Sequence, residues 1–189
     1  MKKRTLLSAI LICLSFCACA RVEVRDCNSV CLRADECADG ALTVMLPYLT
    51  MSYREDMIYS SRVNQRMMVF TDADRFTSFR QEMAAYFQFD VSYDGEASFN
   101  AQTAAYDADY FAENALILVH LNSTSGSSRY ELDYLDNKGE NCIVHIRENA
   151  PETGTDDEAD HFLLLEIPQS ELVEVTYYAA YISEKGTVS

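Results

Sequence analysis

The chain of 189 residues lacks tryptophan and contains only six glycines, three prolines and three histidines. So little glycine and proline excludes collagen-like and low-complexity chains, and the sequence contains no glycine-rich phosphate-binding loop. Basic residues are also scarce, because 15 Lys and Arg stand against 30 Asp and Glu, a formal net charge of −15. A surface this acidic repels phosphate backbones and anionic lipid, so we exclude nucleic acid as a partner.

The first twenty residues have the order of an export signal. Lys2, Lys3 and Arg4 precede an apolar run over 6–16, and small residues follow it. This run is shorter than the roughly 20 residues of a membrane-spanning helix, and no second long apolar run follows. We therefore predict an exported protein that meets the membrane only through a lipid anchor or an uncleaved signal. Without the three basic residues of the signal, the formal charge falls from −15 to −18.

Two kinds of processing fit the end of this signal over 1–20. Ala18-Cys19-Ala20 suits ordinary signal peptidase, which would cleave after Ala20. Phe16-Cys17-Ala18-Cys19 resembles a bacterial lipobox in which Cys19 is lipidated, although Phe16 stands where leucine is usual. We favour lipidation, because cysteines at the end of an apolar signal have no packing role. The prediction is a membrane-anchored lipoprotein of the cell envelope, with a freely secreted chain as the alternative.

Four cysteines follow the signal, at Cys27, Cys31, Cys37 and Cys142. Outside the cytosol an even set suggests disulfides, and four cysteines allow three pairings. We favour a bridge within the first three. Cys142 lies in a strand pattern and is predicted to be a buried thiol, or else the partner that ties the N-terminal segment to the sheet. A zinc site is less favoured, because C-x2-C spacing and neighbouring histidines are absent.

The remaining pattern predicts a single α+β domain over 41–189, preceded by a cysteine-bearing extension over 21–40 with little regular structure. Thr71 should cap one principal helix over about 72–87, whose stripe of Phe76, Phe79 and Met83 packs on one face of a sheet. Five to seven strands are predicted within 41–53, at the edge, and over 65–70, 115–121, 128–135, around 142–146, 161–167 and 173–182. Local turns link most of them, including a hairpin turn over 136–139, so the sheet should be antiparallel and meandering.

Few residues suggest chemistry. The loop over 150–160 carries five carboxylates, and calcium prefers such oxygen ligands, although a solvated acidic loop is the commoner explanation. The residues of this weak calcium site would be Glu152, Asp156, Asp157, Glu158 and Asp160. The three histidines, His120, His145 and His161, all fall on predicted strands, which favours satisfied or surface side chains over a zinc site. Ser125-Gly126-Ser127 lacks the context of a nucleophile elbow. We predict no catalytic residue and no cofactor.

The segment over 110–172 carries a resemblance to a known group of proteins. Asn114, the turn Ser125-Gly126-Ser127 and the strand end Glu166-Ile167-Pro168 are the residues concerned. Here the chain resembles uncharacterised exported bacterial proteins and is similar, more distantly, to the PrcB-type C-terminal domain of a protease-complex subunit. The resemblance implies a small α+β domain that binds a partner protein and performs no chemistry itself.

These observations predict a non-enzymatic, exported and lipid-anchored protein of binding or scaffolding type, whose partner is another extracytoplasmic protein. Exposed tyrosines are the expected contacts, since tyrosine buries much area at a low entropic cost. Tyr177 and Tyr181 should lie on one face of the last strand and Tyr178 on the other. The alternative is an extracytoplasmic metal-dependent hydrolase that uses the acidic loop over 152–160 and a strand histidine. An enzyme requires a concave pocket where carboxylates and histidine converge.

Overall fold

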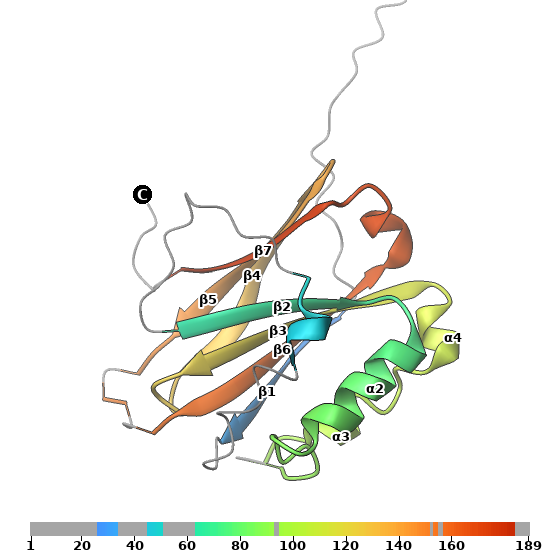
Figure 1. Cartoon of the computed structure of the whole chain (residues 1–189). Helices are drawn as coiled ribbons and strands as arrows, with labels where there is room; N and C mark the ends of the chain where they lie inside the picture. The colour runs from blue at the N-terminus through green and yellow to red at the C-terminus, as the bar shows by residue number, and fades with distance from the viewer. Residues whose placement is uncertain are drawn as a thin grey trace, which may run out of the picture.

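The computed structural model describes residues 26–33, 45–50, 63–92, 95–151, 153–154 and 157–183. The protein is a mixed α+β structure in which strands predominate and helices are few (Figure 1). The described strands form a four-stranded sheet in the order β1-β6-β3-β2 and a three-stranded sheet in the order β4-β5-β7. The first sheet comprises β1 (Asp26–Arg33), β2 (Val63–Phe70), β3 (Asn114–Ser123) and β6 (Ala159–Pro168). The second comprises β4 (Arg129–Lys138), β5 (Asn141–Asn149) and β7 (Tyr177–Ser183).

The central strands β3 and β6 are buried on both faces, as their unbroken apolar sequences predicted. Successive side chains of a strand point to opposite faces. Leu116 and Leu118 therefore pack against the helices, whereas Ile117 and Val119 pack against the second sheet. The antiparallel register of β6 on β3 repeats this division, so the four-stranded sheet separates two cores.

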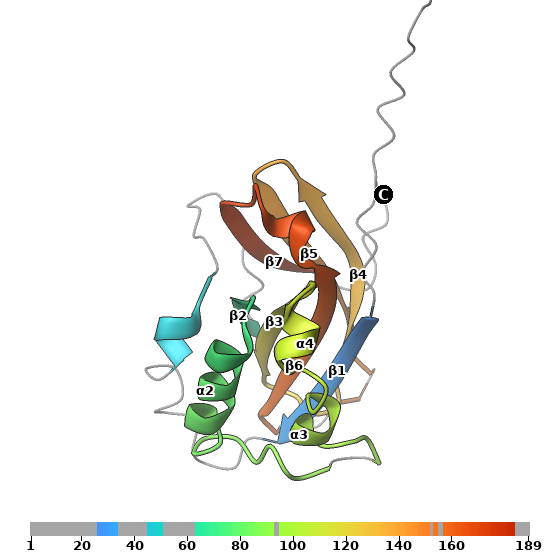
Figure 2. The ribbon, with the colours of Figure 1, turned by 90° about the vertical axis from the view of Figure 1, so that its right-hand side faces the viewer.

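The helices cover one face of the four-stranded sheet (Figure 2). They are α2 (Ala73–Met83), α3 (Phe99–Gln102) and α4 (Ala108–Phe111), and the short 3-10 turn η2 (Leu46–Tyr48) packs beside them. The predicted stripe of α2 is confirmed, because Phe76, Phe79 and Met83 are all fully buried. Edge-to-face and tilted ring contacts, such as the 5.2 Å between the rings of Phe70 and Phe76, make this core strongly aromatic.

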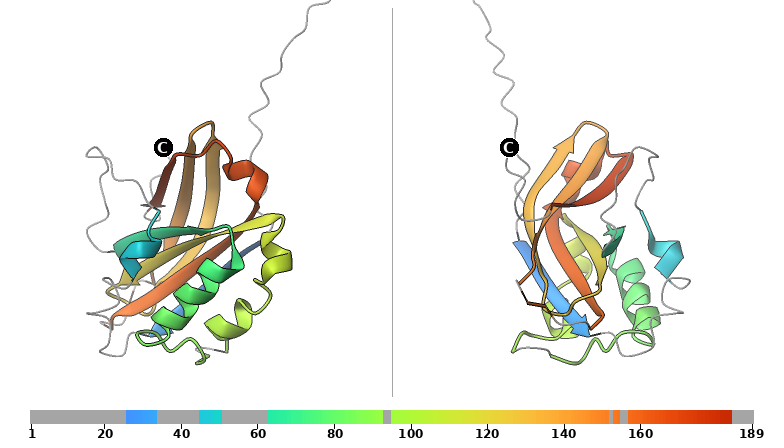
Figure 3. Two further views of the ribbon diagram at one scale, coloured as in Figure 1. Left: turned by 45° about the vertical axis from the view of Figure 1, so that its right-hand side comes forward. Right: turned by 90° about the vertical axis from the view of Figure 1, so that its left-hand side faces the viewer.

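The three-stranded sheet covers the opposite face, and its strands cross those of the first sheet at a steep angle (Figure 3). The 3-10 turn η3 (Gln169–Leu172) leads from β6 toward this second sheet. At one seam between the sheets, β7 lies beside β2, and Gln65 donates a hydrogen bond of 2.6 Å to the carbonyl of Ala180. At the other seam, β4 lies beside β1. The layers are thus helices, sheet and sheet.

The topology differs from the predicted meander in two respects. The strands divide between two sheets, and β7 runs parallel to β5, so a single antiparallel meander is wrong. The predicted extension over 21–40 was expected to have little regular structure, yet residues 26–33 form β1, which pairs with β6 along its whole length. Within the predicted edge strand over 41–53, the described residues 45–50 form η2 and one bridge from Leu49 to Met68.

Two local predictions were also wrong in detail, and one strand is irregular. Asp72, and not Thr71, caps α2, because its carboxylate accepts a hydrogen bond of 2.7 Å from the amide of Arg75. The hairpin between β4 and β5 turns at Gly139, with φ of 58°, and Glu140, so 136–138 belong to β4. A bulge between Leu132 and Tyr134 shifts the register of β4, which leaves Tyr134 exposed and Leu135 buried.

Candidate functional site

The predicted cysteine sites fall mostly outside the described residues. Cys19 and Cys37 lie outside them, and Cys27 and Cys31 lie on β1, whose backbone alone is described. The register of β1 pairs Cys27 with Leu165 and Cys31 with His161. Cys142 is a fully buried free thiol between the two sheets. Burial raises its pKa to about 12, so this thiol is protonated and unreactive at neutral pH.

The described part of the acidic loop does not act as one cluster. Glu152 and Asp156 lie outside the described residues, and the calcium site stays a prediction. Asp157 accepts a hydrogen bond of 3.2 Å from the amide of Gly126, and Glu158 is exposed. Asp160 belongs to β6 and turns into the protein, where it is 2% exposed. The structure therefore assigns Asp157 and Asp160 to two separate contacts.

Asp160 meets His120 on the helix-covered face of the four-stranded sheet. The His120 Nε2 atom lies 2.6 Å from Asp160 Oδ1, and Arg66 donates a hydrogen bond of 3.1 Å to His120 Nδ1. Asn122 donates a further hydrogen bond of 3.2 Å to Asp160. The imidazole is 3% exposed and stacks on the ring of Phe162 at 4.8 Å. Residues from β2, β3 and β6 thus form a polar triad, Arg66–His120–Asp160, in which Arg66 is half-buried and the other two are buried.

The hydrogen-bond donors and acceptors of this triad determine the tautomer of His120. A guanidinium can only donate hydrogen bonds, so the Nδ1 atom of His120 must accept. The proton of the neutral ring then lies on Nε2 and is donated to the carboxylate of Asp160. Both ring nitrogens are therefore engaged, and the ring has no nitrogen left to take a proton from a substrate. No sequence pattern indicates this triad, because His120 and Asp160 meet only through the register of β3 on β6.

His161 is buried on the opposite face, and its environment differs. It is 1% exposed, and neither ring nitrogen has a hydrogen-bond partner among the residues that the structure describes. Its ring meets that of Tyr130 edge-on at 4.8 Å. Burial, with a smaller contribution from Arg129, lowers the pKa of His161 to about 4, so this imidazole is neutral at physiological pH.

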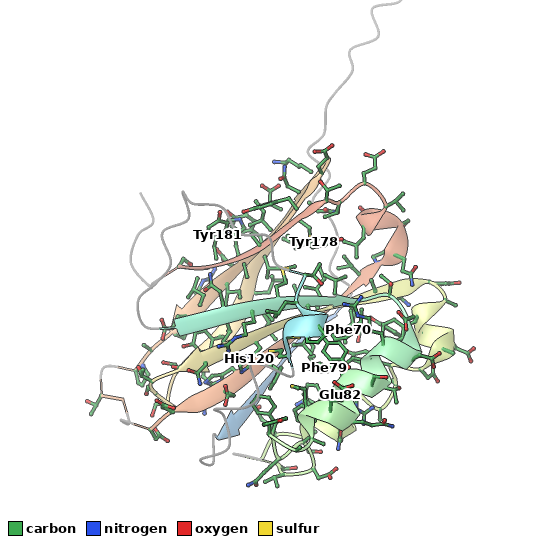
Figure 4. The ribbon with its side chains drawn as sticks, viewed as in Figure 1. Phe70, Phe79, Glu82, His120, Tyr178 and Tyr181 are labelled. Atoms are coloured by element: carbon green, nitrogen blue, oxygen red, sulfur yellow. The ribbon has the colours of Figure 1, made fainter. Side chains whose placement is uncertain are left out.

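His145 lies on the outer face of the three-stranded sheet, between two tyrosines. Its ring stacks on that of Tyr134 at 4.0 Å with an interplanar angle of 13°, and on that of Tyr181 at 5.6 Å with 25°. We call these three residues, one from each strand, the tyrosine row. Tyr134 is 45% exposed, whereas His145 and Tyr181 are half-buried. Figure 4 shows Tyr181 on β7, well separated from His120 on the other sheet.

The two faces of β7 differ as the alternation of its tyrosines predicted. Tyr178 packs against the core between the sheets, and Tyr181 lies in the row on the outer face. Burial lowers the pKa of His145, although Asp136 and Asp133 act in the opposite direction. The row therefore presents neutral aromatic rings beside two carboxylates. Strict alternation would put Tyr134 on the same face as Tyr130, and the bulge in β4 moves it outward.

A shallow hollow of about 280 Å³ lies between α2 and α3. Arg80 lies in it, donates a hydrogen bond of 2.9 Å to Asn100 and sits 5.9 Å from the centre of the Phe76 ring. The lining residues are Thr77, Arg80, Gln81, Ala84 and Asn100. None of them is a carboxylate or a histidine, so this hollow lacks the groups of a hydrolytic centre.

Comparison with known proteins finds no relative of this chain. No protein-family model, no curated protein and no solved structure matches the chain. Within the described ranges, no three or more His, Cys, Asp or Glu side chains gather so as to hold a metal ion. No helix in the same part of the chain combines the length and apolarity needed to cross a membrane.

Proposed function

We propose that the protein is an exported, lipid-anchored envelope protein that performs no catalysis and binds another extracytoplasmic protein through the tyrosine row. The observation that carries this proposal is the exposed and pre-ordered ring of Tyr134. Large aromatic side chains are the commonest anchors of protein interfaces. Stacking on His145 already restrains the Tyr134 ring, so binding would cost little conformational entropy.

The environment of His120 supports a binding role over the alternative hydrolase. That alternative combines a strand histidine with the acidic loop, and Asp160 and His120 are indeed in contact. However, Arg66 and Asp160 occupy both ring nitrogens, and the imidazole is buried against Phe162. A hydrolytic base needs a nitrogen that can reach a water molecule and its substrate. These contacts favour a structural role for His120.

Site-specific crosslinking tests the binding role. The photoreactive residue benzoylphenylalanine replaces Tyr134 in the full-length chain, expressed with its export signal. The matched control places the same residue at Val173, which is 80% exposed on another part of the surface. We expect one discrete adduct at position 134 that is absent at position 173 and is lost when Tyr181→Ala is added. The same adducts from both positions would contradict the proposal.

Lipid labelling tests the anchor separately. The bacterial lipobox prediction assigns the acyl chains to Cys19, with Cys17 as the neighbouring control. Cys19→Ala should abolish labelling with radioactive palmitate and release the protein from the membrane fraction, whereas Cys17→Ala should leave both unchanged. A Cys19→Ala protein that stays labelled would refute the anchor without affecting the proposed binding surface.

A further inference from the structure

The tyrosine row ends at a ring with one open face. Both faces of the His145 ring are covered, one by Tyr134 and the other by Tyr181. Among the described residues, only His145 stacks on the Tyr134 ring, and the residue keeps 45% of its surface exposed. Because β4 ends its sheet, the uncovered face of this ring points away from the row and toward solvent.

Two carboxylates lie near the tyrosine row. Asp133 precedes Tyr134 at the bulge, and Asp136 lies two residues further on, which is the same face of β4. Both are close enough to raise the pKa of His145 against the effect of burial. Asp133 is paired with Arg147, whereas Asp136 meets Lys138 at 3.5 Å in a pair whose lysine is 66% exposed. An exposed pair of this kind contributes little stability, so the carboxylate of Asp136 can exchange its partner.

Charge and stacking geometry exclude several classes of binding partner for the open face of Tyr134. A second copy of a chain with net charge −15 would be repelled, as would nucleic acid or an anionic lipid surface. A sugar platform needs several rings that lie flat on the surface. In this row the rings face one another at 4.0 and 5.6 Å, and the terminal ring of Tyr134 is the most exposed of the three. One open aromatic face beside carboxylates fits a single cation.

We propose that the open face of Tyr134 takes an arginine or lysine side chain of a basic partner protein, with its cation between the ring and Asp136. This inference rests on the proposed binding function and adds the chemistry of the partner. Arginine suits the site better than lysine, because its planar guanidinium can stack on the ring and also donate to a carboxylate. The net charge of −15 would attract such a partner over distance and raise its rate of association.

Peptide titration tests the cation requirement. The full-length chain, held in a non-ionic detergent and labelled with ¹³C in its tyrosine rings, is titrated by NMR at pH 7.5. The probe is a blocked Gly-Arg-Gly-Arg-Gly peptide, and its control carries citrulline, the uncharged isostere of arginine, in place of both arginines. We expect the arginine peptide to shift the Tyr134 ring resonances in a saturable way and the citrulline peptide to leave them unchanged. Equal shifts with both peptides would overturn the proposal.

Variants separate the specific site from general attraction to an acidic protein. Tyr134→Ala should weaken binding of the arginine peptide by about two- to fivefold, the effect of one exposed cation–π contact, while Tyr134→Phe should keep it. Asp136→Asn should weaken binding more than Glu96→Gln, which removes the same charge from an exposed loop. If Tyr134→Ala binds as well as the unaltered chain, or both charge variants act equally, the site is refuted. Discrete crosslinks at position 134 would still uphold the proposed function in that case.

Discussion

The two faces of the four-stranded sheet are built from the same strands and yet have different chemistry. Toward the helices lie all eight phenylalanines of the described residues, at positions 70, 76, 79, 87, 89, 99, 111 and 162. Toward the second sheet the core is mainly aliphatic, with Ile117, Val119 and Leu163 among its members. Large rings fill the irregular space between helices and sheet, whereas two sheets about 10 Å apart leave room for smaller side chains. The shape of each gap therefore governs the residue type.

The same comparison extends to the two buried histidines, His120 and His161. Both are almost fully buried, with 3% and 1% of their surface exposed. His120 is held between Arg66 and Asp160, while the ring nitrogens of His161 have no hydrogen-bond partner within the described ranges. A buried polar group is costly when it lacks a partner, and is retained at little cost when it has one. At nearly equal burial, replacing His120 should therefore cost much unfolding free energy, whereas replacing His161 should cost little.

The largest effect is expected on the His120 side. Asp160→Ala would leave the Nε2–H of His120 and the side-chain amide of Asn122 without their acceptor. Each buried donor left without a partner costs about 1–3 kcal/mol, so we expect a loss of about 3–5 kcal/mol of unfolding free energy. Urea unfolding of the variant and of the unaltered chain at pH 7.5 measures this loss of unfolding free energy. Glu158→Gln, an exposed residue directly before β6, should change the unfolding free energy by less than about 0.5 kcal/mol. Similar losses of unfolding free energy in Asp160→Ala and Glu158→Gln would show that the contact of Asp160 with His120 does not stabilise the protein.

An intermediate effect is expected from acid on the His161 side. The pKa of His161 is about 4 in the folded protein and about 6.5 when unfolded, so the unfolded chain takes up the proton first. The contribution of His161 to the free energy of unfolding is fully present above about pH 6.5. It falls as the pH drops, and by pH 4 about 3 kcal/mol of it is lost. Urea unfolding of the unaltered chain and of His161→Leu between pH 7.5 and 4 measures the difference. Parallel pH profiles would show that His161 is not the acid-sensitive group.

The smallest effect is expected from His161→Leu at pH 7.5. This change removes two nitrogens that lack hydrogen bonds and places an apolar side chain among apolar neighbours, so the unfolding free energy should move by less than about 1 kcal/mol. His120→Leu is the matched control, and it should cost about 3 kcal/mol because it leaves the buried carboxylate of Asp160 without the Nε2–H donor of the imidazole. Thermal unfolding of both variants side by side gives the ranking, and equal costs would remove the distinction between the two faces.

The sequence predicted those elements whose pattern is local. The stripe of Phe76 and Phe79 identified α2, and the unbroken run of β3 identified a central strand, because periodicity reports which face is buried. It did not predict β1, since the polar segment Asp26–Arg33 has no strand period and gains its structure from pairing with β6. The division into two sheets was also missed, because the chain after Ser123 crosses to another layer instead of returning beside β3.

The candidate sites were predicted less completely than the fold. The tyrosines of β7 could be assigned to two faces from their spacing, but Tyr134 required the bulge in β4, which alternation does not reveal. The contact of His120 with Asp160 joins residues 40 positions apart, and only the pairing register brings them together. Contacts of this kind depend on how strands align in space, which a single sequence does not encode in its local pattern.

The bulge in β4 has one more consequence. An edge strand with a regular ladder of free amides and carbonyls is a template onto which the strand of another molecule can add. In β4 the bulge interrupts that ladder, and Asp133 places a charge at the same point. A strand arriving from a neighbouring molecule would meet a broken register and a carboxylate. This edge of a protein made mainly of strands is thereby protected from edge-to-edge polymerisation.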